Sequence, residues 1–136
     1  MNIENFTISD HADNNNGKLS IMGMFDRIDS VSFPAQHAHC CLALRLRFQR
    51  SEEGVHKLRI MLVDADGKAQ LPPFEPDINA SIPEGFDTGT ANLVLNINGL
   101  PVQRPGNLYW DLVLDGQLAA RLPMYVRQVG RQLKAA

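Results

Sequence analysis

The chain has 136 residues with 44% apolar and 21% charged side chains, values typical of one soluble globular domain. Its formal net charge of −2 provides no basic field for nucleic acid or an anionic membrane, and we expect neither as a partner. The only two cysteines, Cys40 and Cys41, are adjacent and cannot form a disulfide framework, which favours a reducing compartment. Residues 1–17 lack the features of a signal peptide, and no apolar run approaches the roughly 20 residues of a membrane span. We therefore expect a cytoplasmic protein.

The first half of the chain alternates apolar and polar residues with the period of a β-strand. Residues 6–8 indicate a short first strand, and residues 19–25 indicate a second one after the turn at 14–17. Residues 40–48 place one cysteine, three leucines and a phenylalanine on one face and arginines on the other, as a half-buried strand does. Another strand is predicted over residues 57–63, before the Asp-Gly turn at 66–67.

The second half begins with a proline-rich segment. Four prolines between residues 72 and 83 exclude a central strand or a helix interior, so an extended loop with room for a short edge strand is predicted over residues 70–89. Alternation returns over residues 90–98, 108–114 and 117–126, between turns rich in glycine and proline. Trp110 is expected in the core, and Tyr109 is either a corner tyrosine or an exposed aromatic residue.

These patterns predict an all-β fold in a single domain. The strands are short and regularly spaced, and no window has a sustained 3.6-residue period. Outward positions carry charge, which favours an antiparallel β-sandwich of about seven to eight strands, immunoglobulin-like or of a related Greek-key topology. The domain is expected to cover residues 1–126, with a short basic tail at 127–136.

Four segments carry a recognisable combination of turns and strands: DHADNNNGKLSIMGMFDRI, FPAQHAHCCLALRLRF, GVHKLRIMLVDADG and PGNLYWDLVLDG. Their most characteristic pieces are Gly-Lys-Leu at residues 17–19 and Gly-x-Phe-Asp at residues 23–26. Over residues 10–126 the chain resembles a small bacterial family of uncharacterised β-sandwich proteins. The resemblance implies a compact β domain, and it transfers no activity, cofactor or site residue.

The segment HAHCC, residues 37–41, offers a candidate metal site. His37, His39 and Cys41 project to one face of an extended chain, and imidazole and thiolate are good zinc ligands. However, three such ligands on one strand are spread over roughly 13 Å, so a zinc site needs help from another strand or a second chain. The favoured alternative places both histidines in the loop entering the strand, Cys40 in the core and Cys41 on the outer face.

The other two histidines, His11 and His56, are further candidate ligands, but no spacing in the sequence places them near the HAHCC segment. Cys40 with His56, or Cys41 with His39, form possible nucleophile pairs. A strand offers no helix dipole to activate a thiol, so we expect no catalytic residue from either pair.

A basic outer face is the second candidate site. Arg45 and Arg47 on one predicted strand and Lys57 and Arg59 on the next all point away from the core. If these strands pair as a hairpin, Arg47 faces Arg59, and the repulsion calls for an acidic side chain such as Asp111, another subunit or an anionic ligand. If the strands belong to different sheets, the basic face does not exist.

Two acidic loops are weaker candidates. The run DNNNG at residues 13–17 and the run Asp64 to Gly67 contain oxygen ligands suited to calcium. The closing glutamate of a calcium loop is missing, since the twelfth position from Asp13 is Met24. Both runs are therefore interpreted as turns.

The sequence thus favours a non-enzymatic protein-binding or assembly module that uses its long loop or an edge strand, with a protein partner or a second copy of itself. No nucleotide-binding, nucleophile-elbow or metalloprotease motif is present, and no cofactor is expected. Two alternatives remain open: a zinc protein using His37, His39 and Cys41, and an anion or saccharide binder on the basic face of Arg45, Arg47, Lys57 and Arg59.

Overall fold

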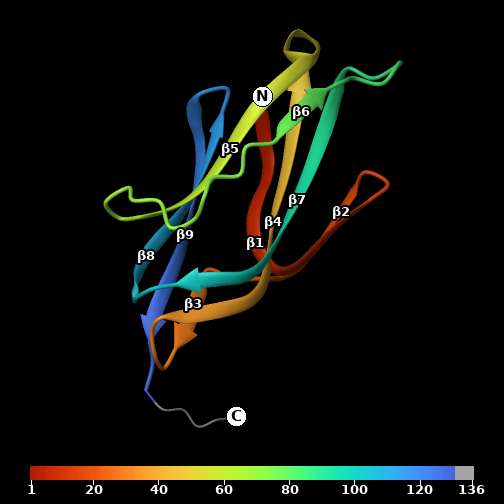
Figure 1. Cartoon of the computed structure of the whole chain (residues 1–136). Coiled ribbons are helices and arrows are strands. Elements are labelled where there is room, and N and C mark those ends of the chain that lie inside the picture. The colour runs from red at the N-terminus through yellow and green to blue at the C-terminus, as the bar shows by residue number, and fades with distance from the viewer. Residues whose placement is uncertain (131–136) are drawn as a thin grey trace.

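The computed structural model describes residues 1–130, which form nine strands in two stacked sheets (Figure 1). The strands are β1 (Asn2–Asn15), β2 (Lys18–Met24), β3 (Arg27–Ser30), β4 (Ala35–Gln49), β5 (Gly54–Asp64), β6 (Asp77–Ala80), β7 (Thr88–Val102), β8 (Gly106–Leu114) and β9 (Gln117–Gln128). A 3-10 turn, Arg50–Glu52, links β4 to β5. Within residues 1–130, no helix is long and apolar enough to cross a membrane.

The strand order confirms the all-β sandwich. One sheet has the order β2-β1-β4-β7 and the other the order β3-β9-β8-β5-β6. The chain therefore changes sheet five times, before and after β3, between β4 and β5, and before and after β7. Two details differ from the expectation. The strands described number nine rather than seven or eight, because the four-residue strands β3 and β6 are too short to give a period. In addition, β3 pairs with β9 in parallel, not antiparallel, fashion.

The core lies between the inner faces of the two sheets. The predicted alternation of β4 is confirmed, since Cys40 and the leucines at 42, 44 and 46 are buried there. They meet the inward residues of β5 and β8, among which Trp110 is fully buried as expected. Tyr109 points the other way and is half-buried under the guanidinium of Arg121, 5.0 Å from the ring centre to the arginine carbon Cζ.

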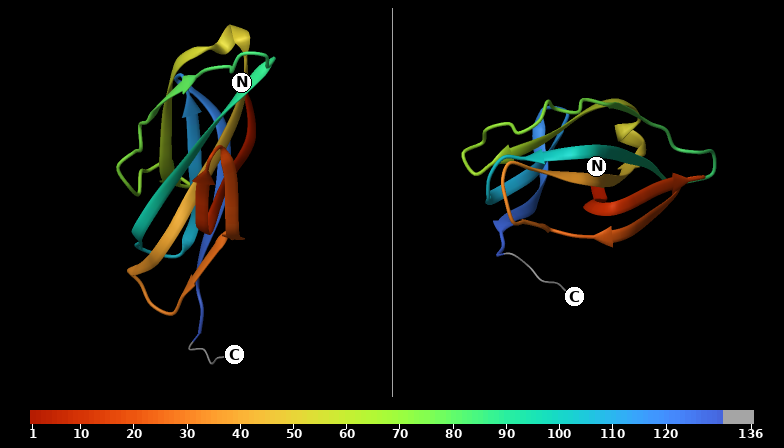
Figure 2. Two further views of the ribbon diagram at one scale, coloured as in Figure 1. Left: turned by 90° about the vertical axis from the view of Figure 1, so that its right-hand side faces the viewer. Right: turned by 60° about the horizontal axis from the view of Figure 1, so that its bottom comes forward.

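The hairpin of β1 and β2 adds a second, smaller apolar cluster on the outside of the first sheet. Figure 2 (left) shows this hairpin in front of β4 and β7. Ala12, Leu19 and Ile21 pack there against β4 and β7, contacting Cys41, Ala43 and Val94. The Asn92 side chain of β7 donates to the hairpin turn, at Asn14 Oδ1 (3.2 Å) and the Gly17 carbonyl (3.1 Å). The outer face of β4 is therefore covered at Cys41 and Ala43, while Arg45 and Arg47 on the same face remain partly exposed.

Several predicted boundaries change because cross-strand pairing continues past the residues that alternate clearly. The first strand is 14 residues long, and β7 continues through Gly99 and Pro101, which the sequence predicts as part of a turn. The last strand ends at Gln128, two residues beyond the predicted domain end at 126. Of the basic tail predicted at 127–136, residues 131–136 lie outside the described part of the chain. The loop predicted over residues 70–89 is present with β6 as its short edge strand, but it ends at residue 87 because β7 begins at Thr88.

Candidate functional site

Three metal-binding side chains meet on the outer face of the four-stranded sheet. One ligand atom from each of His11, His39 and Cys41 lies within 4.8 Å of the others. The pairing of β1 with β4 ends where Ser9 is opposite Cys41. Beyond this point β1 continues into the hairpin that folds over Cys41, and it carries His11 to His39 and Cys41. The Ser9 hydroxyl is fully buried and donates to the His11 carbonyl at 3.1 Å, which fixes the backbone at this point.

The structure brings together only two of the three predicted ligands. His39 and Cys41 belong to the cluster, with 3.5 Å between the imidazole Nε2 and the thiol Sγ. His37 does not belong to it, because its ring packs against Phe25 with 5.4 Å between ring centres. His11 takes the third place. The long separation between residues 11 and 39 hides this contact from any spacing motif, and only the pairing of β1 with β4 reveals it.

Two asparagines of β7 orient the cluster from the neighbouring strand. Asn98 is opposite His39, and its Oδ1 accepts a hydrogen bond from the imidazole Nδ1 at 2.8 Å. With Nδ1 as the donor of this bond, the lone pair of Nε2 faces the thiol. Asn96 is opposite Cys41, and its Oδ1 accepts from the thiol at 3.2 Å. Nothing in the sequence singles out these asparagines beyond their position on one strand face.

The two cysteines differ in their surroundings although both are free and fully buried. Cys40 points into the core, as predicted, and burial raises the pKa of its thiol to about 11. Cys41 is on the outer face of the sheet, as predicted, but the β1–β2 hairpin covers it. The nucleophile pair of Cys40 with His56 does not form, since His56 instead binds the Asp115 carboxylate through Nδ1 at 2.5 Å and the Glu52 carbonyl through Nε2.

The predicted basic face is divided between the two sheets. Arg45 and Arg47 lie on β4 in one sheet, and Lys57 and Arg59 lie on β5 in the other, so the strands do not pair as a hairpin. Glu4 of β1 binds both β4 arginines, through Oε1 to Arg45 Nε at 2.9 Å and through Oε2 to Arg47 Nε at 2.5 Å. These bonds lower the pKa of the Glu4 carboxyl, with the Arg47 hydrogen bond as the largest cause.

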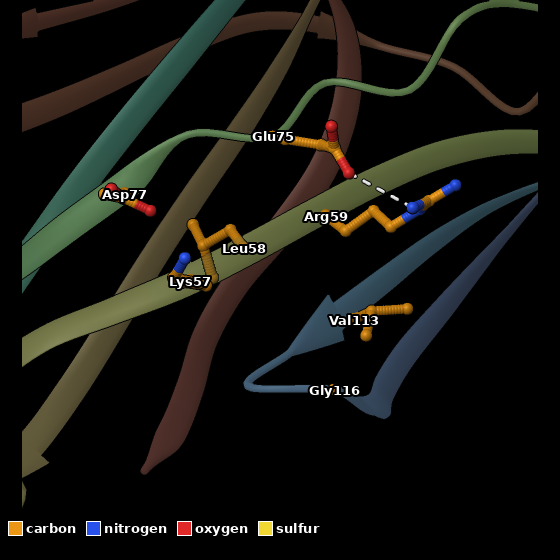
Figure 3. Close-up of a pocket in the computed structure, with 7 residues that line it drawn as sticks. All are labelled: Lys57, Leu58, Arg59, Glu75, Asp77, Val113 and Gly116. Atoms are coloured by element: carbon orange, nitrogen blue, oxygen red, sulfur yellow. Dashed lines mark hydrogen bonds and ion pairs between the residues drawn. The ribbon is translucent and has the colours of Figure 1, made fainter.

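The other half of that predicted face also has acidic neighbours. Arg59 Nη1 lies 3.1 Å from Glu75 Oε1, and Lys57 is opposite Asp77 in the pairing of β5 with β6 (Figure 3). These side chains line an open pocket of about 340 Å³. Since each basic group has a carboxylate beside it, the pocket has mixed charge, and the four basic residues do not form one anion-binding surface.

The two acidic runs behave as turns. Residues 14–17 form the end of the β1–β2 hairpin, with Asn16 and Gly17 at positive φ. Asp64 Oδ1 accepts the backbone N–H groups of Asp66 and Lys68, each at 2.9 Å. These hydrogen bonds lower the pKa of the Asp64 carboxyl, the bond from Lys68 most of all. This oxygen of Asp64 therefore holds the local backbone of the turn.

The free edge of β7 is the most unusual strand edge in the molecule. β7 has 15 residues and pairs with β4 on one side, and among residues 1–130 no other strand pairs with it. It contains no charged residue, whereas the edge strands β2, β3 and β6 have at most seven residues and each carries charge. Leu93 and Leu95 of β7 are only partly buried. A long, uncharged and partly apolar edge is a template for another strand.

Comparison with protein families agrees with the resemblance found in the sequence. The model of a family of unknown function, DUF6941, matches residues 4–127. The chain belongs to this family. Comparison with curated proteins found no match.

The match to DUF6941 covers every side chain of the two features described above, the His11–His39–Cys41 cluster and the β7 edge. The cluster can coordinate a soft or borderline metal ion through two imidazoles and one thiolate. The edge can accept a strand through its backbone N–H and C=O groups. These two capacities are chemically independent, because one uses side chains on the sheet face and the other uses the backbone at the sheet edge.

Proposed function

We propose that this protein is a non-enzymatic assembly module whose β7 edge pairs with a second copy of the chain. The observation that carries the proposal is the length and neutrality of this edge. Natural sheets protect their edges with charges, bulges or short strands, and β7 has 15 residues without a charge. An edge left open in this way is best explained by a strand that covers it in the assembled protein.

The β7 sequence favours a second copy as the covering strand. In an antiparallel two-fold pair, each residue faces a residue at an equal distance on the other side of the centre. With Val94 at the centre, Asn92 faces Asn96, Leu93 faces Leu95, and Gly89 faces Gly99. Like residues thus meet on each face of the extended sheet, and the half-buried leucines gain a shared apolar contact.

Measurement of the molar mass tests this proposal. We expect size-exclusion chromatography with light scattering to give twice the chain mass for the wild-type protein. Leu93→Glu and Leu95→Arg each place an unpaired charge against a leucine of the second copy, so each variant should be monomeric. An equimolar mixture should recover the dimer, because the glutamate of one variant then faces the arginine of the other.

Ser20→Glu on β2 is the matched control, since it adds the same charge to an exposed position on the opposite edge of the same sheet. It should leave the dimer intact. Circular dichroism spectra of all variants should match the wild type. A wild-type protein that stays monomeric across the micromolar range, or a dimer that survives Leu93→Glu, would refute the proposal.

The strand order supports a further proposal about the fold, that the sandwich is immunoglobulin-like. In that arrangement, strands A, B and E share one sheet, and strands C, F and G share the other. β1, β4 and β7 have the neighbour order of A, B and E, and β5, β8 and β9 have that of C, F and G. The C-terminal half of β1 and the strand β2 then form an inserted hairpin that precedes β3. We also propose a cytoplasmic location, supported by the two free thiols.

A further inference from the structure

We infer that His11, His39 and Cys41 form a zinc site that fastens the β1–β2 hairpin to β4. The inference goes beyond the proposed assembly through β7, because it assigns a metal ion to side chains on the sheet face. All three groups are metal ligands, and they come from two strands that are adjacent in the sheet. The three ligand atoms already lie within 4.8 Å of one another.

The distances suit a tetrahedral ion. With bonds of about 2.3 Å to sulfur and about 2.05 Å to nitrogen, tetrahedral zinc holds neighbouring sulfur and nitrogen ligands about 3.6 Å apart. The separation between Cys41 Sγ and His39 Nε2 is 3.5 Å, which matches this geometry as it stands. His11 is exposed and lies in the hairpin, so its ring needs a shift of about 1 Å to complete the set.

The neighbouring strand supplies the supporting contacts that metal ligands usually have. A histidine that binds zinc through one ring nitrogen commonly donates the other N–H to a fixed oxygen, which sets its orientation. His39 donates its Nδ1–H to Asn98 and so presents Nε2 to the metal. The amide of Asn96, 3.2 Å from Cys41 Sγ, can turn its NH₂ group toward the thiolate that zinc requires.

The three ligands are shielded from water on the Cys41 side and open to solvent on the histidine side. Cys41 is fully buried beneath the apolar residues of the hairpin, which shield the metal–sulfur bond from water. His39 is half-buried and His11 is exposed, so the ion is reached from solvent on the histidine side. Three protein ligands leave a fourth tetrahedral position, which water or an exchangeable ligand fills.

The ligand set favours zinc over the hard cations. Magnesium and calcium require oxygen ligands, and this cluster offers two imidazole nitrogens and one sulfur instead. Among the divalent ions suited to nitrogen and sulfur, zinc prefers the tetrahedral geometry that these strands provide. The bound ion thereby joins residue 11 of the hairpin to residues 39 and 41 of β4 through metal–ligand bonds.

Cobalt substitution tests the inference directly, and untagged protein is needed because an added histidine tag also binds metal. Titration of the wild-type protein with Co²⁺ should produce the thiolate-to-cobalt charge-transfer band and the visible bands of tetrahedral cobalt, at one ion per chain. Added Zn²⁺ should abolish both. Absence of the thiolate band on the wild-type protein would overturn the inference, and this result does not depend on the folding of any variant.

Variants then identify the ligands. We expect Cys41→Ser to abolish the thiolate band and to weaken Zn²⁺ binding at least 100-fold, measured by competition with a chromophoric chelator. His11→Gln should weaken binding at least tenfold, and Asn98→Ala about tenfold through the lost support of His39.

His37→Gln and Cys40→Ala are the matched controls, since each removes the same type of side chain from the same strand outside the cluster. Both should change Zn²⁺ affinity less than threefold. Binding that follows His37 or Cys40 instead of His11 or Cys41 would overturn the assignment. The molar mass of the Cys41→Ser variant separates this inference from the proposed dimer, because loss of zinc should leave the β7 edge and its pairing unchanged.

Discussion

Asp111 on β8 and Arg121 on β9 are directly opposite each other, and the guanidinium donates to both carboxylate oxygens, at 2.7 and 2.8 Å. The carboxylate side chain is only 8% exposed, whereas the arginine is half exposed and also covers the Tyr109 ring. The sequence suggested Asp111 as a partner for the predicted basic face. Asp111 instead pairs with Arg121 on the adjacent strand β9. The ion pair therefore stabilises the pairing of β8 with β9 and is not part of a basic binding surface.

Removal of Arg121 should therefore destabilise the protein by leaving a buried carboxylate without its partner. We expect Arg121→Met to lower the Tm by about 5 °C at neutral pH. Arg127→Met is the control, since Arg127 lies over Tyr125 in a similar way but donates to neutral oxygens. Differential scanning calorimetry measures both. Equal decreases in Tm would mean that arginine stabilises the protein by stacking on tyrosine and not by pairing with the Asp111 carboxylate.

The pair of His56 and Asp115 should make stability depend on pH. Both ring nitrogens of His56 face acceptors, Asp115 Oδ2 and the Glu52 carbonyl, so the ring is doubly protonated when both bonds form. The Asp115 hydrogen bond is the larger cause that raises the pKa of His56, and His56 in turn lowers the pKa of Asp115.

The direction of the effect follows from these shifts. The His56 contribution is complete below its unfolded pKa near 6.5 and is lost as pH rises through the raised folded value. The Asp115 contribution is complete above its unfolded pKa near 3.8 and is lost as pH falls through the lowered folded value. The pair should thus contribute fully between about pH 4 and 6.5. Thermal unfolding against pH should show a decline above this range that His56→Gln and Asp115→Asn both remove.

Gly89 of β7 should not accept a side chain. A Cβ atom at this position would lie 2.7 Å from Phe48 Cε2 and 2.8 Å from the Ser81 carbonyl oxygen, and the backbone oxygen has little freedom to move. We expect Gly89→Ala to destabilise the protein by about 1–3 kcal/mol in urea unfolding. Gly130→Ala is the control, because no atom lies within 4 Å of the corresponding Cβ. A neutral Gly89→Ala would show that the loop carrying Ser81 adjusts.

The side chain of Trp110 has two opposing effects on stability. Its large ring fills the core, and its buried N–H group lacks a hydrogen-bond partner in the described part of the chain. Its ring is fully buried, and among residues 1–130 the buried Nε1–H finds no hydrogen-bond partner. Trp110→Ala should cost about 3–5 kcal/mol because it empties the centre of the core. Trp110→Phe should cost less than half as much, because it removes the unpaired N–H while keeping an aromatic ring. Urea unfolding followed by circular dichroism compares the two, and a cost of Trp110→Phe above half that of Trp110→Ala would contradict this expectation.

Whether a feature of the structure could be predicted depends on how far apart in the sequence the interacting residues lie. The two-residue period of residues 40–48 predicted the inward face of β4 correctly, because alternation is a property of the extended backbone itself. The strands β3 and β6 were missed or left open, because four residues are too few to show a period. The covered position of Cys41 was not predictable either, since the hairpin that buries it comes from residues 12–21.

The sequence by itself determined the fold class, the core face of β4, the hairpin turn at residues 14–17 and the presence of metal-binding residue types, because these depend on neighbours a few residues apart. Only the tertiary structure decided that His11, not His37, joins His39 and Cys41, and that the four basic residues lie on different sheets. The physical reason is strand register. The pairing of Ser9 with Cys41 is set by how two distant strands bury their apolar faces together, and a shift of one residue would separate the three ligands.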